Sequence, residues 1–289
     1  AIASVTNDHA STTYPVGTTT VTWTVTDLAG NTATCAQDII VTDNEAPVVT
    51  CPSTVNQTAD AGLCTATVAS IGTPVTTDNC AIATVTSDHA STTYPVGTTT
   101  VTWTVTDIHG NVTTCTQDII ISDNEQPSIT CPVAVNVSPD AGVCTASGVV
   151  LGSPVTADNC GVATVTNDAP AIFNSGATTV TWTVTDIHGN VNTCTQVVTV
   201  TDTENPVITC PADITQTADA GLCSATVATL GTPVTSDNCA VATVTNDHAS
   251  TTYPVGTTTV TWTVTDLAGD TATCQQTIIV TDNEAPIVS

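Results

Sequence analysis

Pairs of carboxylates recur at four places along the chain, each in an Asp-x-Glu-x-Pro segment. The pairs are Asp43 with Glu45, Asp123 with Glu125, Asp202 with Glu204, and Asp282 with Glu284. Calcium takes six to eight oxygen ligands, and such a segment offers carboxylates, amide oxygens and free backbone carbonyls. Lysine and arginine are absent from the chain, so no basic side chain of either kind can neutralise these acids. We therefore predict calcium (Ca2+) sites at these segments.

Strand topology adds further candidate ligands. A strand of about ten residues, roughly 33 Å long, is expected to end at each acidic segment, so the Asp-x-x-Gly turn at its start lies beside the preceding segment. Asp107 and Asn111 should then approach Asp43 and Glu45, Asp186 and Asn190 should approach Asp123 and Glu125, and Asp266 should approach Asp202 and Glu204. Asp78, Asp158 and Asp237, each in an Asp-Asn pair, are also candidates. In the alternative reading, these Asp and Asn residues serve only as turn formers and solvated charge.

The other repeated acids and the histidines carry weaker signals. Two sets of aspartates are predicted to be turn residues: Asp8, Asp88, Asp168 and Asp247, and Asp60, Asp140 and Asp219. The histidines are predicted to lie on loop surfaces: His9, His89, His109, His188 and His248. Some copies of the repeat lack them, which argues against a shared histidine site.

Thirteen cysteines recur with nearly constant spacing. Closely paired ligands such as Cys-x-x-Cys, which zinc sites use, do not occur, so two disulfides per repeat are the favoured reading, and they require an oxidising compartment. Four cysteines allow three connectivities. Alternation points Cys51 and Cys115 into one core, which favours Cys51–Cys115 with Cys64–Cys80. The analogous pairs are Cys131–Cys194 with Cys144–Cys160, and Cys210–Cys274 with Cys223–Cys239, and Cys35 is left without a partner in the sequence.

The elements that position these residues are β-strands. Around Trp23, Trp103, Trp182 and Trp262, Val and Trp alternate with Thr, the period-two pattern of a half-buried strand. In the second copy this pattern points Val101, Trp103 and Val105 inward. The tryptophans recur about every 80 residues. We predict an all-β chain of tandem immunoglobulin- or fibronectin-like β-sandwiches arranged end to end: a partial repeat at 1–46, full repeats at 47–126, 127–205 and 206–285, and the start of another at 286–289. These full repeats are called the second, third and fourth below.

The spaced motifs resemble the hyalin repeat (HYR) domain. They are Cys-Pro, Asp-Asn, Tyr-Pro-Val-Gly, the Thr-Val-Thr-Trp-Thr-Val-Thr-Asp strand, and the final Thr-Cys, and they extend over nearly the whole chain. The resemblance implies an extracellular, immunoglobulin-like module that often occurs in tandem in adhesive or matrix proteins, with no catalytic residues to carry over. The Asp-x-Glu-x-Pro segments also resemble the calcium-binding linkers of cadherins and of tandem bacterial adhesins.

Charge and composition narrow the function. The net charge is −26 without any Lys or Arg, which excludes nucleic acid and anionic membrane surfaces as partners. No apolar run is long enough to span a membrane, and no signal peptide is visible. Because the chain starts and ends inside a repeat, it is expected to be part of a longer, secreted or cell-surface protein.

Four readings of function follow. The first is a disulfide-stapled, calcium-rigidified stalk or extracellular filament, with neighbouring repeats and identical chains as partners. The alternative is a cell-adhesion module that binds a glycan or protein ligand, and ice or mineral binding by outward threonines is a weaker reading. An enzyme is the least favoured, because no catalytic pocket motif recurs.

Overall fold

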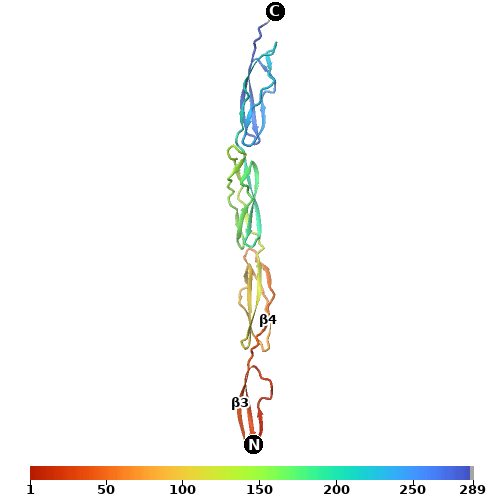
Figure 1. Ribbon diagram of the computed structural model, residues 1–289, viewed down its shortest axis with the longest axis vertical. Coiled ribbons are helices and arrows are strands. Elements are labelled where there is room, and N and C mark those ends of the chain that lie inside the picture. The colour runs from red at the N-terminus through yellow and green to blue at the C-terminus, as the bar shows by residue number, and fades with distance from the viewer. Residues whose placement is uncertain (287–289) are drawn as a thin grey trace. The chain divides into compact units, whose positions relative to one another are not determined.

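The computed structural model describes residues 1–286, which form strands, turns and loops (Figure 1). Within these residues, no helix has the length and apolar composition needed to cross a membrane. The chain divides into two units, residues 1–125 and residues from Gln126 onward, and each is described by itself. Of the repeat start expected at 286–289, residues 287–289 lie outside the described part.

The first unit contains a three-stranded sheet followed by the second repeat. The three-stranded sheet has the order β1-β2-β3, and the second repeat has a four-stranded sheet of order β5-β11-β10-β8 with two-stranded sheets β4-β7 and β6-β9. The strands are β1 (Ile2–Asn7), β2 (Gly17–Asp27), β3 (Thr32–Val41), β4 (Val48–Thr50), β5 (Val55–Thr58), β6 (Thr65–Thr67), β7 (Val75–Thr77), β8 (Ile82–Ser87), β9 (Thr93–Pro95), β10 (Gly97–Asp107) and β11 (Val112–Ser122).

The second unit contains the third and fourth repeats, which follow the same strand order. Their four-stranded sheets are β13-β19-β18-β16 and β21-β27-β26-β24. The strands are β12 (Ser128–Thr130), β13 (Val135–Val137), β14 (Thr145–Ser147), β15 (Val155–Ala157), β16 (Val162–Asn167), β17 (Ile172–Asn174), β18 (Gly176–Asp186), β19 (Val191–Val200), β20 (Val207–Thr209), β21 (Ile214–Thr217), β22 (Ser224–Thr226), β23 (Val234–Ser236), β24 (Val241–Asn246), β25 (Thr252–Pro254), β26 (Gly256–Asp266) and β27 (Thr271–Thr281).

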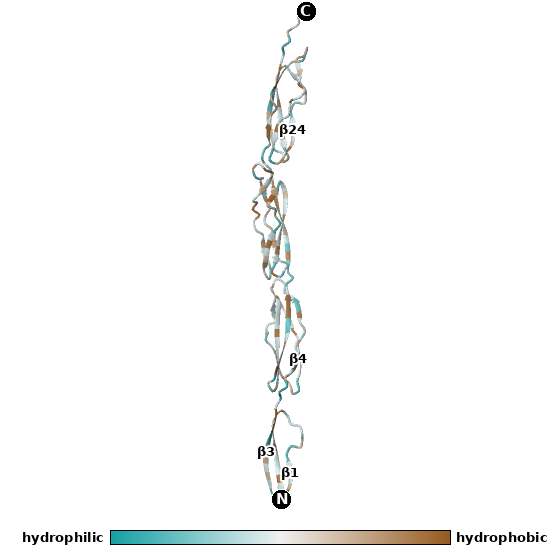
Figure 2. Cartoon of the chain, viewed as in Figure 1, coloured by the Kyte–Doolittle hydropathy of each residue, from teal (hydrophilic) through white to brown (hydrophobic). Residues whose placement is uncertain are grey.

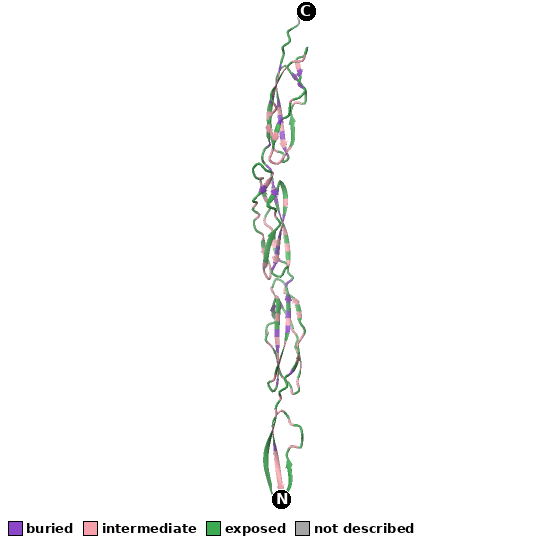
Figure 3. Ribbon diagram, in the orientation of Figure 1, coloured by how far each residue is buried: buried purple, intermediate pink, exposed green. Residues whose placement is uncertain are grey.

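The Thr-Val-Trp strand and its successor form the predicted hairpin, and its apolar side chains make the core. Val101 and Val105 are fully buried and Trp103 is 7% exposed, as the alternation predicts. Val101 and Trp103 pack with Ala66 on β6 and Tyr94 on β9, so the small β6-β9 sheet covers the hairpin. Buried positions accordingly lie along the long strands (Figure 3), and apolar residues alternate with polar ones there (Figure 2).

A buried polar network, which the sequence analysis did not identify, joins the two layers of each full repeat. Gln276 is 0% exposed and accepts a hydrogen bond from Trp262 Nε1 at 3.1 Å. Its Nε2 donates to the carbonyl oxygens of Ala212 and Leu230, both at 2.8 Å. Gln117 and Gln196 make the equivalent bonds in the second and third repeats. The glutamine therefore satisfies three backbone or indole groups that burial would otherwise leave unpaired.

Two short strands depart from what the sequence pattern reveals. The Gly, Pro and Asn residues of 72–80 are typical of an irregular connection, but β7 within them pairs with β4 in an antiparallel ladder. Only three residues pair there, too few for an alternation pattern to reveal. In the third repeat, residues 169–176 differ in sequence from the other copies and contain β17, whose Phe173 is buried in the core position of the tyrosines.

The disulfides agree with one predicted set of pairs and overturn the other. Cys51–Cys115, Cys131–Cys194 and Cys210–Cys274 are present, as predicted. The other three predicted pairs are wrong: Cys64–Cys80, Cys144–Cys160 and Cys223–Cys239. Cys144 instead bonds Cys239 of the next repeat. Cys80 and Cys223 are free thiols, whereas Cys64 and Cys160 are each in a disulfide. In the third repeat, the cysteines of the Gly-x-Cys and Asp-Asn-Cys turns therefore form no disulfide with each other. The Gly-x-Cys cysteine is bonded to the following repeat instead.

Candidate metal centre

A group of three carboxylates lies in the first unit. One oxygen from each of Asp43, Asp78 and Asp107 lies within 4.8 Å of the others. Asp43 follows β3, Asp78 follows β7, and Asp107 ends β10, so a linker, a loop and a hairpin turn converge. The structure thus places Asp107 beside Asp43, as the strand topology predicts, and the additional candidate Asp78 joins them.

Backbone hydrogen bonds orient these carboxylates. Asp43 Oδ1 accepts the N–H of Glu45 at 3.1 Å, and Asp78 Oδ2 accepts those of Cys80 and Ala81 at 2.9 and 3.1 Å. Asp107 Oδ1 accepts the N–H of Asn111 at 2.8 Å. Each aspartate thus uses one oxygen to bond its own turn, a common role of Asp. Asp78 Oδ1 is buried without a hydrogen-bond partner.

Neighbouring polar side chains make hydrogen bonds to some of the oxygens of Asp43 and Asp107. Asn111 Nδ2 donates to Asp107 Oδ2 at 2.7 Å and to the Asp43 carbonyl at 3.2 Å, so its amide nitrogen rather than its oxygen makes these contacts. His109 lies in the exposed turn between β10 and β11, as predicted, and its Nδ1 lies 3.1 Å from Asp43 Oδ2. Burial acts to raise the pKa of Asp107, but the Asn111 hydrogen bonds outweigh it and lower that pKa.

The free thiol of Cys80 belongs to the same neighbourhood. Asp43, Cys80 and His109 also form a group of three metal-ligating atoms, and the hydrogen bond with Asp43 raises the pKa of Cys80 to about 11. Such a mixed set is typical of zinc rather than calcium. The fourth repeat does not reproduce it, because Cys239 is in a disulfide and Ala268 stands where the second repeat has His109.

The second unit contains an equivalent group in which the oxygens are not satisfied. One oxygen from each of Asp202, Asp237 and Asp266 lies within 4.8 Å of the others. Asp202 and Asp266 are 6% and 2% exposed. Asp202 Oδ2, Asp237 Oδ1 and Asp266 Oδ2 are all buried without a hydrogen-bond partner, as is Asn238 Oδ1. Buried polar atoms are nearly always paired, so these four oxygens form a donor set that could hold a cation.

A sequence difference explains why this group is less satisfied than the first. Asp270 replaces the asparagine found at Asn111, so no amide donates to Asp266 Oδ2. Asp266 Oδ1 still accepts the N–H groups of Gly269 and Asp270 at 2.7 and 2.8 Å, and the turn keeps its shape. Asn238 Nδ2 donates to Asp202 Oδ1 at 3.1 Å, but no amide or histidine bonds Asp202 Oδ2, Asp237 Oδ1 or Asp266 Oδ2.

The remaining predicted aspartates and asparagine lie in the two units as follows. Asp123 Oδ1 accepts the N–H of Glu125 at 3.1 Å in the first unit. In the second unit, Asp158 Oδ2 accepts the N–H of Cys160 at 2.8 Å, and Asp186 Oδ2 accepts a bond from Asn190 Nδ2 at 2.7 Å. Asp282 Oδ1 accepts the N–H of Glu284 at 2.9 Å. Their binding of calcium stays a prediction.

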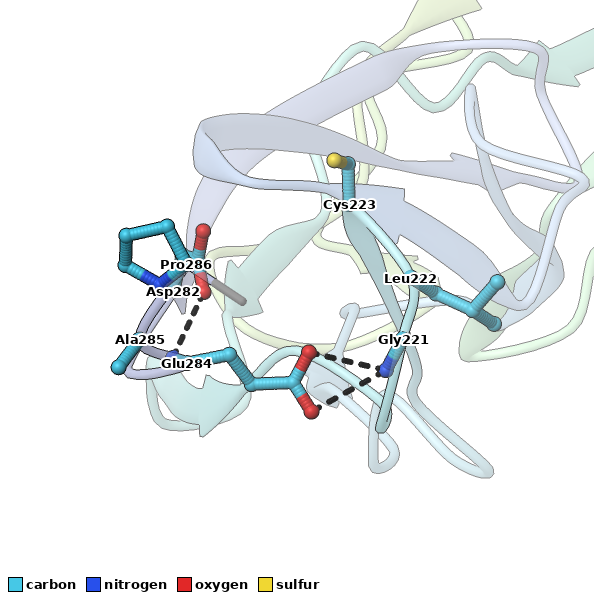
Figure 4. A pocket seen from close by; sticks show the side chains of 7 residues that line it. All are labelled: Gly221, Leu222, Cys223, Asp282, Glu284, Ala285 and Pro286. Carbon is cyan, nitrogen blue, oxygen red and sulfur yellow. Dashed lines mark hydrogen bonds between the residues drawn. The ribbon is translucent and has the colours of Figure 1, made fainter. Parts of the chain in front are cut away.

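The glutamates make a different contact. Within residues 1–286, Glu45, Glu125, Glu204 and Glu284 belong to none of the carboxylate groups. Glu125 accepts the N–H of Gly62 at 2.8 Å, and Glu284 accepts that of Gly221 with both oxygens at 3.2 and 3.0 Å (Figure 4). The glycine belongs to the Asp-Ala-Gly turn of the same repeat, so each of these two glutamates ties its linker to the repeat that precedes it.

The other acids and histidines have structural roles. Asp88 Oδ1 accepts the N–H of Thr102 at 2.8 Å, and Asp8, Asp168 and Asp247 make the same bond in their copies. His89 stacks on Tyr94 with ring centroids 4.4 Å apart, and His9 and His248 stack on tyrosines likewise. These three histidines lie in loops, as predicted, but they are half-buried where they stack on the tyrosines. The nearby Tyr-Pro was the only sequence signal for this stacking.

The sequence of the chain is similar to that of a known protein family. A family model described as the HYR domain matches residues 1–41, 42–121 and 201–280. Hyalin from Strongylocentrotus purpuratus is 33% identical over 92% of this chain and 23% of its own length. Hyalin from Lytechinus variegatus is 31% identical over 94% of this chain and 54% of its own length. The chain thus spans at most about half the length of these two relatives.

Two solved structures of cadherin-type extracellular domains align with most of this chain at low TM-scores. A protocadherin gammaB4 extracellular domain gives a TM-score of 0.35 at 15% identity, covering 91% of this chain and 55% of that one. Drosophila N-cadherin EC1-4 gives 0.34 at 12% identity, covering 94% and 85%.

Proposed function

The chain belongs to the HYR domain family, and on this premise we propose that it is a structural component of an extracellular stalk or filament whose repeat junctions bind calcium. The family consists of adhesive and structural modules rather than enzymes, and the disulfides fit an oxidising, extracellular location. The observation that carries the calcium proposal is the group of Asp202, Asp237 and Asp266 with its unpaired buried oxygens.

The donor set of this group suits calcium. The three carboxylates supply hard oxygen ligands, and Asn238 adds an amide oxygen close to them in sequence. Calcium accepts six to eight oxygens in a flexible geometry, with water or backbone carbonyls completing the shell. Magnesium requires a near-ideal octahedron and keeps its waters, and thiolate-seeking metals find no free cysteine here because Cys239 is bonded.

Binding at this group would hold a junction together. Asp202 belongs to the linker after β19, whereas Asp237 and Asp266 belong to a loop and a hairpin turn of the following repeat. A cation shared by the three would replace mutual repulsion with attraction and would restrict the linker. The sequence repeats the same three aspartates at the linkers of Asp43 and Asp123, which supports stiffening of the junctions as the role of these sites.

Calcium titration tests the proposal. Isothermal calorimetry on the oxidised chain, after chelation and dialysis, should show calcium uptake that magnesium does not match at the same concentration. Differential scanning calorimetry should show a higher unfolding midpoint, and small-angle scattering should show a stiffer particle in calcium. Absence of uptake would refute the calcium proposal and leave the acids as turn formers and solvated charge.

A further inference from the structure

The Cys144–Cys239 disulfide joins two consecutive repeats, with a Cα–Cα distance of 4.5 Å. Cys144 ends the Gly-x-Cys turn of the third repeat, and Cys239 ends the Asp-Asn-Cys turn of the fourth. Beside this bond, Asn238 Nδ2 of the fourth repeat donates to the Val143 carbonyl at 3.4 Å and to Asp202 Oδ1 at 3.1 Å. The trailing end of one repeat is thus bonded to the leading end of the next.

Cys223 occupies the position of Cys144 in the fourth repeat and is held in the same local geometry. The Cys223 carbonyl accepts the N–H of Val255 at 3.0 Å, as the Cys144 carbonyl accepts that of Ser175 at 3.1 Å. Asp219 Oδ2 accepts the N–H of Thr226 at 3.0 Å, as Asp140 Oδ2 accepts that of Ser147 at 3.0 Å. Cys223 is nevertheless a free, exposed thiol.

The surface around Cys223 is open where the equivalent surface in the third repeat is covered. Leu267 and Ala268 of the fourth repeat line the cavity beside Cys144, together with Gly176 and Asp202. At Cys223, a cavity of about 880 Å³ is lined by the Gly221–Cys223 turn, Asp282, Glu284 and Pro286 (Figure 4). The exposed Leu222 and the bonded pair of Gly221 with Glu284 frame it.

We propose that Cys223 and this cavity are a docking site for the leading end of a further HYR repeat, placed after the linker of Asp282 and Glu284. The incoming repeat bonds Cys223 through the cysteine of its Asp-Asn-Cys turn. Cys80, the free cysteine of such a turn, is the complementary half. Two thiols form one disulfide, and oxidised glutathione takes up the two electrons and two protons as two molecules of reduced glutathione. The site does not depend on calcium.

An extended chain tests this site. A copy of residues 210–286 is appended to Ser289, which continues the register because Pro286 to Ser289 align with Pro206 to Thr209. The copy of Cys223 in the added repeat is changed to Ser, so that only one Gly-Leu-Cys-Ser peptide contains a thiol. The chain is folded in a glutathione redox buffer, with and without calcium, and free thiols are alkylated. The products are cut with a protease specific for Asp and Glu, since the chain lacks Lys and Arg.

Cys223 should be fully alkylated in the original chain and unlabelled in the extended one. Mass spectrometry should find it linked to the added copy of Cys239, in calcium and in chelator alike. A matched control in which that added cysteine is Ser should return Cys223 to full labelling. Labelling of Cys223 in the extended chain would overturn the proposal, as would a Cys223–Cys80 bond between two molecules. Because the outcome is independent of calcium, it is distinguishable from failure of the calcium proposal.

Discussion

The substitution Asp266→Asn should have opposite effects on stability with and without calcium. Asp266 Oδ1 bonds its own turn, and Asp266 Oδ2 is the buried, unpaired oxygen. Asparagine preserves the first role and replaces the second oxygen with an amide that donates. In chelator, that amide can bond the carboxylates of Asp202 and Asp237, whereas in calcium it removes one anionic ligand.

The size of each effect follows from the distances. The three oxygens lie within 4.8 Å of one another, so each pair of charges repels by at least about 0.9 kcal/mol even at the dielectric constant of water. Asp266→Asn removes two of the three pairs, which gives about 1.7 kcal/mol of stabilisation in chelator. Calcium at about 100 times its Kd stabilises the wild-type site by about 2.7 kcal/mol.

Scanning calorimetry on the wild type and on Asp266→Asn, each in chelator and in calcium, measures the stabilisation and the destabilisation. For a repeat of this size, one kcal/mol shifts the midpoint by about 4–8 °C. In chelator at low ionic strength, where screening is weak, the variant should unfold about 10 °C above the wild type. In calcium the order should reverse or the gap should close.

A matched variant and a refuting result complete the design. Asp213→Asn removes one charge from the same repeat but lies outside the carboxylate group, and its Oδ1 contact with the Thr277 N–H at 2.8 Å is one that asparagine retains. It should leave the calcium response unchanged. If Asp266→Asn lowers the midpoint in chelator, or responds to calcium as the wild type does, the carboxylates do not form a cation site.

Two further predictions concern the rest of the fold. Gln276→Leu should lower the free energy of unfolding by at least about 3 kcal/mol, because it leaves Trp262 Nε1 and the carbonyls of Ala212 and Leu230 unpaired; denaturant unfolding measures it, and Gln275→Leu at the exposed neighbouring position should change little. The Thr261 N–H holds the pKa of Asp247 below its usual value, so this aspartate adds stability that is present above a pH of about 3.9 and is lost as pH falls through the lower folded pKa. Calorimetry from pH 5 to pH 2 should show a falling midpoint with a weaker fall in Asp247→Asn, and equal slopes would contradict this assignment.

Alternation was enough to predict the hairpin, its buried Val101 and Trp103, and the Cys51–Cys115 bridge. In each case the side chains of a single repeat determine the answer, because period two assigns every residue to a face. The convergence of Asp202 with Asp266 also followed, since the length of one strand fixes which ends meet. These features depend on geometry within a strand or between its two ends.

The missed features depend on partners that no local pattern encodes. Cys144 and Cys160 have the same types of neighbours whether the bond closes within a repeat or reaches the next one. Gln276 sits at a core position by alternation, and only the opposing carbonyls make a polar residue stable there. The stack of His89 on Tyr94 likewise depends on how a loop folds back onto β9.

Each full repeat also carries its own limit on extension under tension. The Cys51–Cys115 bridge closes a stretch of 64 residues, and the third and fourth repeats close 63 and 64. A pulling force along the backbone is transmitted through the disulfide. The residues between the two cysteines therefore bear no tension, even after the sheets separate. At about 3.3 Å per residue, reduction would release about 210 Å of hidden length from every repeat. Oxidised repeats of this kind should therefore extend very little under force, whereas reduced repeats should unfold and extend by this additional length.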